Sequence, residues 1–282
     1  MFFIRLISYT PLNILYVISD FLYFVSYHIL RYRRKQVWKN LQNSFPDKTD
    51  RDRLAIQKEF YKNLCDYAVE TLKLLTISQE ELRKRMVFKT PALPERYAGK
   101  NQSIIILASH IFNWEWLLTA ACCNLPYPID FVYQKVNSEF FERISLTIRT
   151  RFGAFPIERS KVARQIIARK NILRGIAMMA DQYPGHGEDK KYQTNFLNQD
   201  TIFFLGTNQV AGLTQYPVLY YQVKKLRRGY YEARVIEIAT PPYEKNSYSV
   251  IEKYVRMVEV DIRENPAGWL WSHNRWKKRH IT

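Results

Sequence analysis

The stretch Ser103–Leu118, SIIILASHIFNWEWLL, contains the change of pattern that decides the fold. Its first six residues are continuously apolar or small, which is typical of a strand buried on both faces of a sheet. Asn113 suits the N-cap of a helix, and Glu115 suits the first turn, where an acidic side chain interacts favourably with the helix dipole. The stretch therefore predicts a buried strand, a corner near His110 and a helix over Asn113–Cys123.

The same alternation of strand and helix signals continues along the chain. We expect strands at Ile129–Tyr133, Ala154–Ile157 and Ile176–Ala180, and helices near Glu139–Arg151 and over Val162–Leu173. Strands that alternate with helices in this way form a parallel sheet, because each helix crosses back over the sheet. The predicted fold class is therefore α/β, with a mostly parallel central sheet flanked by helices.

Segments on either side of this core complete the prediction. Arg51–Thr76 has the apolar periodicity of an amphipathic helix, and Asn246–Arg263 is expected to be a closing helix. Pro217–Val223 and Tyr230–Ile238 are typical of a hairpin joined across a basic turn. Tyr183–Gln199 is predicted to be a long polar loop, either functional or a plain surface excursion.

The segment Leu12–Leu30 is apolar and would cover roughly 28 Å as a helix, close to the ~30 Å hydrocarbon core of a bilayer. Asp20 lies near its centre, where an acidic group costs about 2.5–3.5 kcal/mol. Polar and tyrosine side chains also line one face, namely Asn13, Tyr16, Asp20, Tyr23 and Tyr27. That face either meets the lipid headgroups or docks onto the rest of the protein, so both a spanning and an interfacial helix are compatible with the sequence.

Basic residues are distributed unevenly around this segment. Arg31, Arg33, Arg34 and Lys35 follow it, whereas only Arg5 precedes it. Such a bias places the rest of the chain on the cytoplasmic side. We expect residues 1–35 to be a membrane anchor or interfacial helix with a basic flank, and residues 36–282 to be one α/β domain.

The 282 residues include 43 Lys and Arg against 26 Asp and Glu, a formal net charge of +17. This excess indicates an anionic partner: nucleic acid, an anionic membrane surface or an acidic substrate. The chain contains no recognisable nucleic-acid module, so a basic nucleic-acid-binding protein is only a remote alternative. Three cysteines without a CxxC spacing predict buried thiols and no metal site.

His110 and Glu115 together have a chemical use. If the histidine ends the strand and a helix begins near Asn113, the first turn brings Glu115 toward the imidazole. An imidazole has an ordinary pKa of about 6.5 and accepts a proton near neutral pH, and a carboxylate on its other nitrogen fixes the tautomer. His110 would then take a proton from a substrate hydroxyl, whose oxygen attacks an acyl carbonyl. In the alternative, His110 merely caps the corner and Glu115 is solvated.

Seven short motifs occur in a characteristic order. They are NLQNSFPD (Asn40–Asp47), SHIFNWEW (Ser109–Trp116), VYQK (Val132–Lys135), IERSK (Ile157–Lys161), ADQ (Ala180–Gln182), FFLG (Phe203–Gly206) and WLWSHNRWK (Trp269–Lys277). In this order the chain resembles the late lipid A acyltransferases, the lauroyl and myristoyl transferases of lipid A biosynthesis. They belong to the wider group of glycerolipid acyltransferases that share a His-x-x-x-x-Asp/Glu motif.

The resemblance implies a glycerolipid-acyltransferase-like fold and an enzyme of the bacterial inner membrane, with its catalytic domain on the cytoplasmic face. The implied reaction transfers a fatty acyl chain from acyl carrier protein to a hydroxyl of a membrane glycolipid, a Kdo-bearing lipid A precursor. By the same resemblance His110 is the base and Glu115 its partner, and neither a metal nor another cofactor is expected. An O-acyltransferase acting on a lysophospholipid or an aminoacyl lipid is the alternative.

Five further residues are candidates for substrate binding. Arg159 follows a strand end, where a guanidinium either grips a substrate phosphate or forms a surface ion pair. Asp181 and Gln182 also follow a strand; they either support neighbouring site residues or, for Gln182, donate to a developing oxyanion. Asn113 either contacts substrate or only caps its helix.

Arg275 belongs to a basic C-terminal segment that also contains Lys277 and Lys278. These side chains either bind the anionic groups of a glycolipid or of acyl carrier protein, or form a solvated basic tail. The tryptophans of the same segment, Trp269, Trp271 and Trp276, are expected in the core or at an interface.

Overall fold

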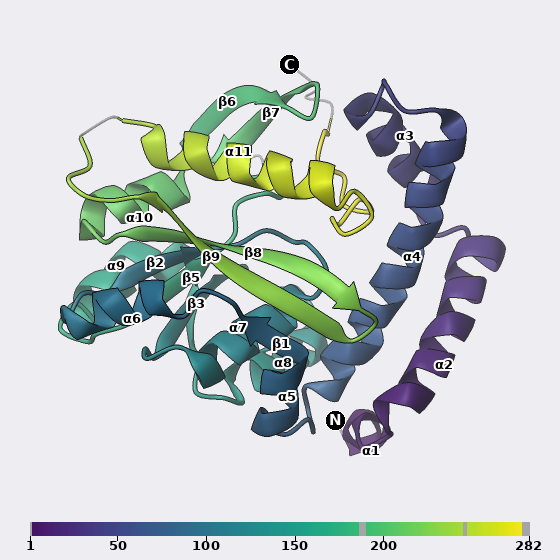
Figure 1. The fold of residues 1–282 in the computed structure, drawn as a ribbon, viewed down its shortest axis with the longest axis horizontal. Coiled ribbons are helices and arrows are strands. Elements are labelled where there is room, and N and C mark those ends of the chain that lie inside the picture. Colours follow the sequence, from purple (N-terminus) through teal and green to yellow (C-terminus); the bar gives the residue numbers. More distant parts are fainter. Residues whose placement is uncertain (1, 186–189, 245–246, 278–282) are drawn as a thin grey trace.

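A seven-stranded, mostly parallel sheet forms the centre of the computed structural model, which describes residues 2–185, 190–244 and 247–277 (Figure 1). The strand order is β1-β9-β8-β2-β5-β3-β4. The strand bounds are β1 Met86–Phe88, β2 Ile104–Leu107, β3 Ile129–Tyr133, β4 Phe155–Glu158, β5 Gly175–Met178, β8 Val218–Arg227 and β9 Tyr230–Ala239. Neighbouring strands from β8 to β4 are parallel, and only the β8–β9 pair is antiparallel. The predicted α/β fold class is confirmed.

Helices cover both faces of this sheet because its apolar side chains point to both sides. Their bounds are α5 Gln79–Arg85, α6 Ala92–Gly99, α7 Trp114–Asn124, α8 Glu139–Thr150, α9 Val162–Ala168, α10 Gly206–Thr214 and α11 Ser249–Glu264. In β2, Ile105 and Leu107 enter one core cluster with α11, whereas Ile104 and Ile106 enter a second cluster with α7. All four residues of this strand are buried, as the continuous apolar run predicts.

The predicted corner between β2 and α7 is present. Asn113 is the N-cap of α7, and its Oδ1 accepts a hydrogen bond of 2.9 Å from the backbone N–H of Trp116. The segment between the strand and the helix is tied to the C-terminal end of the chain, since Ile111 forms a β-bridge with Trp269. The corner therefore stands at the carboxyl end of a central strand.

The polar segment Tyr183–Gln199 is not a continuous loop, so this prediction is wrong in part. Among its described residues, β6 (Lys191–Phe196) pairs antiparallel with β7 (Gln199–Phe204) as a separate two-stranded sheet. Only one side of β6 is apolar: Phe196 is buried against Phe203 and Trp269, while the side chains of Gln193 and Asn195 are exposed. Contacts with residues distant in the sequence, such as Trp269, therefore stabilise this strand.

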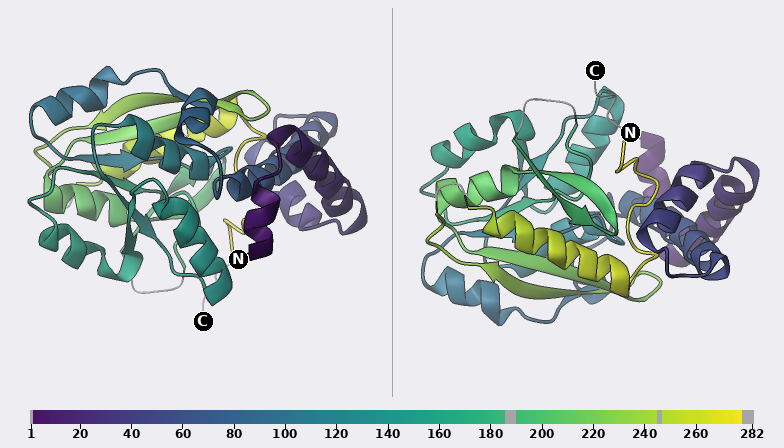
Figure 2. Two further views of the ribbon diagram at one scale, coloured as in Figure 1. Left: turned by 90° about the horizontal axis from the view of Figure 1, so that it is seen from below. Right: turned by 90° about the horizontal axis from the view of Figure 1, so that it is seen from above.

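The N-terminal helices gather at one end of the sheet, where both views of Figure 2 show them beside the α/β core. Their bounds are α1 Phe2–Ser8, α2 Leu12–Tyr23, the π-helical η1 Phe24–Ile29, α3 Arg34–Ser44 and α4 Asp50–Lys73. α2 packs along α4, the long helix that joins it to the body. The sequence is compatible with a polar face of this helix that meets lipid headgroups or docks onto the rest of the protein. In the structure, this face is docked onto α4.

Candidate active site

A cavity of about 560 Å³ lies beside the carboxyl ends of the parallel strands, where open α/β sheets bind ligands. Apolar side chains from three strands and from α7 form much of its wall, among them Ile106, Leu117, Ala121, Phe131 and Ala177. Polar residues also line it, among them His110, Glu115, Arg149, Arg159 and Gln182. The cavity thus joins an apolar slot to a group of ionisable side chains.

His110 is held by Asp181 at two points. Its Nδ1 lies 2.7 Å from Oδ1 of the carboxylate, and its backbone N–H donates to Oδ2 at 2.9 Å. The register of the sheet explains the contact, because Leu107 of β2 pairs with Met178 of β5, and each of the two residues comes three positions later. The indole Nε1–H of Trp269 donates a further bond of 2.9 Å to Oδ2.

The Asp181 carboxylate is fully buried but charged. Burial alone would raise its pKa, yet the attraction to His110 in its protonated form and the hydrogen bonds from His110 and Trp269 lower the pKa to about 2. An ionised carboxylate only accepts hydrogen bonds, so Nδ1 of His110 carries the proton that points at it. Nε2 is then the ring nitrogen left to accept a proton from a substrate.

Glu115 does not contact the imidazole, so the expected His110–Glu115 hydrogen bond is wrong. Its carboxylate instead forms a two-point ion pair with Arg149 of α8, with distances of 2.5 Å from Nη2 to Oε1 and 2.9 Å from Nε to Oε2. Trp114, the first residue of α7, packs edge-on against the ring of His110 at 5.0 Å between centroids. Glu115 thus points toward α8 while still lining the cavity.

Asn113 is a helix cap whose side chain is completely buried. Its Oδ1 caps α7, and its Nδ2 donates to Oε2 of Glu70 at 2.7 Å. Both ends of the amide are therefore bonded within the protein. The expectation that Asn113 contacts substrate does not hold for this geometry.

Arg159 and Gln182 both stand on the cavity wall, after β4 and β5 respectively. Nη1 of Arg159 donates to Oε1 of Gln134 at 3.3 Å, and its guanidinium lies 4.4 Å from the centroid of the Phe204 ring. The structure thus brings these two predicted residues to the same cavity as His110. Their roles toward a substrate stay predictions.

Arg275 is not part of a solvated tail, because only 1% of it is exposed. Its Nη2 donates to the carbonyl of Ile202 at 2.6 Å, and its guanidinium lies 4.5 Å from the centroid of the Phe203 ring. Burial lowers its pKa to about 10. Lys278, the last residue of the predicted basic group, lies outside the described residues.

Arg275 lines a second cavity of about 520 Å³, in which polar side chains predominate. Lys39, Asn40, Asn43, Gln193, Gln199 and Lys277 are among the other residues around it. Tyr183 lines both cavities, so the polar one adjoins the apolar one.

The comparison with protein families agrees with this geometry. A model of the bacterial lipid A biosynthesis acyltransferase family matches residues 1–278. The chain belongs to this family. No curated protein matches it. The matched region includes both the His110 corner and the C-terminal segment that contacts this corner. Membership of this family identifies the protein as an acyltransferase.

Two residues that support the acyltransferase site are absent from the sequence predictions. The hydroxyl of Tyr254 on α11 donates to the carbonyl of Ala108 and accepts from the N–H of Ala180, each at 2.9 Å, and so ties together the ends of β2 and β5. Nε2 of His273 accepts a bond of 3.0 Å from the N–H of Tyr183. Burial and the charge of Arg275 lower the pKa of His273 to about 4, so this imidazole is neutral. The motif WLWSHNRWK pointed to the segment but to neither contact.

Trp269 was expected in the core, and its ring is indeed buried in the main core cluster. Its bond to Asp181 adds a polar role that a pattern of tryptophans does not reveal. Within the described ranges, no group of three or more His, Cys, Asp or Glu side chains is arranged to hold a metal ion.

Proposed function

We propose that this lipid A acyltransferase moves a fatty acyl chain from acyl carrier protein to a hydroxyl of a lipid A precursor, with His110 as general base. The observation that carries the proposal is the buried, charged Asp181 carboxylate on Nδ1 of His110, beside an apolar cavity. A carboxylate in this position orients the imidazole and stabilises the imidazolium that forms during proton transfer.

The reaction proceeds by direct transfer. Nε2 of His110 takes the proton of the acceptor hydroxyl while the oxygen attacks the thioester carbonyl. The tetrahedral intermediate then collapses, the carbon–sulfur bond breaks, and the leaving thiolate takes the proton back from the imidazolium. Asp181 stays ionised throughout, which agrees with its low pKa.

The apolar cavity is the proposed binding site of the acyl chain. Ile106, Phe131 and Ala177 reach it from the sheet, and Leu117 and Ala121 reach it from α7. Each methylene that enters such a slot contributes about 0.8 kcal/mol by leaving water. The bound chain would place its thioester at the polar end, beside His110.

The polar end of the cavity supports an anionic donor. Lys135 and Lys161 are both exposed. Lys135 follows the lining residue Gln134 in the chain, and Lys161 comes two positions after the lining residue Arg159. Acyl carrier protein is acidic, and the chain as a whole carries a net charge of +17. Complementary charge of this kind speeds association and orients the partner.

The second cavity supports a glycolipid acceptor. Amide side chains and the exposed Lys39 and Lys277 suit the hydroxyl and phosphate groups of a sugar headgroup. A headgroup held there, beside Tyr183, would direct one of its hydroxyacyl chains toward His110. The membrane that supplies this acceptor is, in this proposal, the bacterial inner membrane, with the catalytic domain on its cytoplasmic face.

The test uses the purified full-length protein with acyl carrier protein loaded with a fatty acyl chain and a Kdo-bearing lipid A precursor. Mass spectrometry should show the precursor gaining one acyl chain with the wild type, and no gain with His110→Gln. Asp47→Asn changes an exposed carboxylate that lines neither cavity; it is the control and should keep full activity. Transfer to a lysophospholipid or an aminoacyl lipid, but not to the precursor, would replace the proposed acceptor.

A further inference from the structure

The N-terminal helical segment Leu12–Ile29 has the length and composition of a membrane span, with a mean hydropathy of 1.3. It is the one such helix among the described residues. Length and composition do not distinguish a helix that crosses a bilayer from one that lies along its surface. The contacts of the helix make this distinction.

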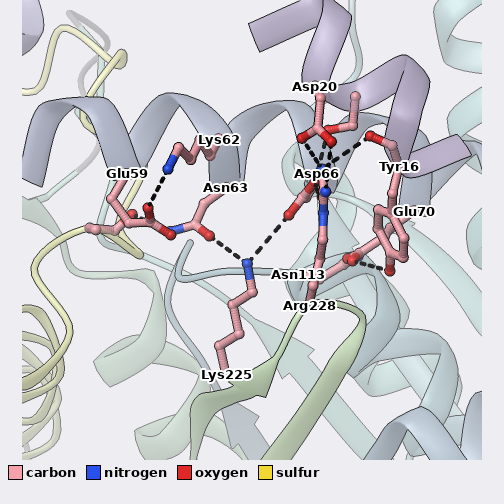
Figure 3. A network of polar contacts seen from close by, with 12 residues as sticks. Tyr16, Asp20, Glu59, Lys62, Asn63, Asp66, Glu70, Asn113, Lys225 and Arg228 are labelled. Carbon is pink, nitrogen blue, oxygen red and sulfur yellow. Dashed lines mark hydrogen bonds and ion pairs between the residues drawn. The ribbon is translucent and has the colours of Figure 1, made fainter. Parts of the chain in front are cut away.

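One side of the segment is hydrogen-bonded to α4 along its length, as Figure 3 shows for its first half. The hydroxyl of Tyr16 donates to Oε1 of Glu70 at 2.8 Å, and the hydroxyl of Ser19 donates to Oδ1 of Asp66 at 2.8 Å. Both carboxylates are buried. They lie one helical turn apart on α4, so they meet successive turns of α2.

Arg228, in the turn between β8 and β9, joins the two helices by ion pairs (Figure 3). Its Nη2 lies 2.7 Å from Oδ1 of Asp20 and 2.6 Å from Oδ1 of Asp66. The same nitrogen donates to the carbonyl of Tyr16 at 3.2 Å. Asp20, the acidic group at the middle of the apolar segment, is therefore paired with a cation of the catalytic domain.

The opposite side of the segment is apolar and exposed. Val17 is 68% exposed and Phe21 is 65% exposed, and Ile14 and Phe24 extend the same surface. Phe3 and Leu6 continue it onto α1. We call these six residues the apolar stripe.

Exposed basic residues accompany the stripe: Arg5 lies in α1 between Phe3 and Leu6, and Arg31 and Lys35 follow η1. Basic side chains near an anionic lipid surface are attracted to its headgroups. An apolar stripe accompanied by exposed basic side chains matches the layered chemistry of an anionic bilayer surface, whose hydrocarbon lies beneath charged headgroups.

We propose that α1, α2 and η1 lie in the surface of an anionic membrane as a fixed part of the catalytic domain, and that the chain does not cross the bilayer. Crossing would pull Tyr16 and Ser19 away from α4. The buried carboxyl groups of Glu70 and Asp66 would each lose a hydrogen-bond donor, and Asp20 would enter the hydrocarbon, where an acidic group is unfavourable. Lying in the surface places the stripe in lipid and keeps every one of these contacts.

The docked helix is also connected to the catalytic corner. Glu70, which accepts the bond from Tyr16, accepts a second bond of 2.7 Å from Nδ2 of Asn113, the N-cap of α7. A helix that left α4 would therefore remove a partner from the carboxylate that holds this cap. The surface position keeps the anchor and the corner in one hydrogen-bonded unit.

Chemical labelling tests the topology of the full-length protein without any activity assay. Arg5→Cys reports on the N-terminus and Arg51→Cys on the body, each in a chain with Cys122→Ser, since Cys65 and Cys123 are buried. A membrane-impermeant maleimide should label both sites in the same population of sealed membrane vesicles, inside-out or right-side-out. Labelling of the two sites from opposite sides of the membrane would overturn the proposal.

A disulfide tests the docking itself. The hydroxyl of Ser26 lies 3.6 Å from the Sγ of Cys65, so Ser26→Cys should become cross-linked to Cys65 when membranes are treated with an oxidant. The variant with both Ser26→Cys and Cys65→Ser is the control. The cross-linked protein should still float with phosphatidylglycerol vesicles; loss of flotation would show that binding needs a released helix and would sink the proposal.

The stripe has a separate test by vesicle flotation. Val17→Ser/Phe21→Ser should reduce recovery with phosphatidylglycerol vesicles by about tenfold or more, because two apolar side chains no longer enter lipid. Val260→Ser changes an exposed apolar residue of α11 and should leave recovery unchanged. Equal recovery of the double variant and the wild type would refute the assigned surface.

Discussion

Nδ1 of His110 lies 2.7 Å from Oδ1 of Asp181, although 71 positions separate the two residues in the chain. The contact follows from the parallel pairing of β2 and β5, which brings the third residue after each strand to the same place. The carboxylate also binds the backbone N–H of His110, so it fixes both the ring and the corner that carries it.

We predict that Asp181→Asn lowers kcat by a factor on the order of 10² to 10⁴, as general-base catalysis depends on the correct tautomer. KM should change little, since the carboxylate is buried behind the imidazole. The double variant His110→Gln/Asp181→Asn should be no slower than His110→Gln alone, because the two residues act as a unit. Full activity of Asp181→Asn in the acyl-transfer assay would contradict this assignment.

Glu115 is predicted to stabilise the folded protein through its ion pair with Arg149. Glu115→Gln should lower the free energy of unfolding by about 3–5 kcal/mol, because the change leaves a mostly buried guanidinium without its partner. Glu115→Gln/Arg149→Gln should recover much of that loss, as measured by denaturant titration of the purified protein. If Glu115→Gln melted like the wild type but lost all turnover, a direct catalytic role would be the better explanation.

Asp261 should make the protein less stable as the pH rises. Burial raises its pKa to about 6, despite hydrogen bonds from Tyr220 and Gln222. A carboxyl whose pKa is higher in the folded state favours folding below its unfolded pKa of about 3.9, and this contribution is lost as the pH passes 6. Asp261→Asn should therefore remove about 2 kcal/mol of the decrease in unfolding free energy between pH 4 and pH 7. An unchanged pH profile of stability in this variant would disprove the prediction.

Glu70 is predicted to position the catalytic corner through Asn113. Glu70→Gln and Asn113→Asp should each reduce kcat. The first replaces one of the two oxygens that accept bonds from Tyr16, Asn113 and Tyr231 by an N–H donor, and the second places two carboxylates together in a buried site. The double variant restores one donor and one acceptor, and aspartate is also a good N-cap, so kcat should recover. Tyr231→Phe removes a different donor to Glu70 and serves as the control. A double variant slower than both single variants would argue against the link.

The depth of the apolar cavity is predicted to select the acyl chain. Ala121 is a buried residue of α7 that lines it, so Ala121→Phe should fill part of the slot. Product mass spectra from mixed acyl donors should then shift toward shorter chains, because a long chain no longer fits without strain. Leu213→Phe on the exposed face of α10 should leave the distribution unchanged.

Local patterns in the sequence were sufficient to predict the main elements of the fold. The apolar run before His110, the cap at Asn113 and the alternation that follows are properties of short segments, because backbone preference and side-chain burial act over a few residues. The same patterns placed Arg159, Asp181 and Gln182 after strands that end at one edge of the sheet. The sequence also predicts a face of polar and tyrosine side chains on the N-terminal helix, but it does not determine whether this face contacts lipid headgroups or the rest of the protein.

Tertiary structure alone decided which of these groups meet. The partner of His110 depends on β5 being the neighbour of β2 and on their register, and neither is visible in the spacing of five residues that suggested Glu115. In the same way, β6 is stabilised by the packing of Phe196 against Trp269. Helix α2 is docked because Glu70 and Asp66 of α4 accept hydrogen bonds from it. Such contacts join segments that are distant along the chain, and their energies depend on geometry that only the folded backbone supplies.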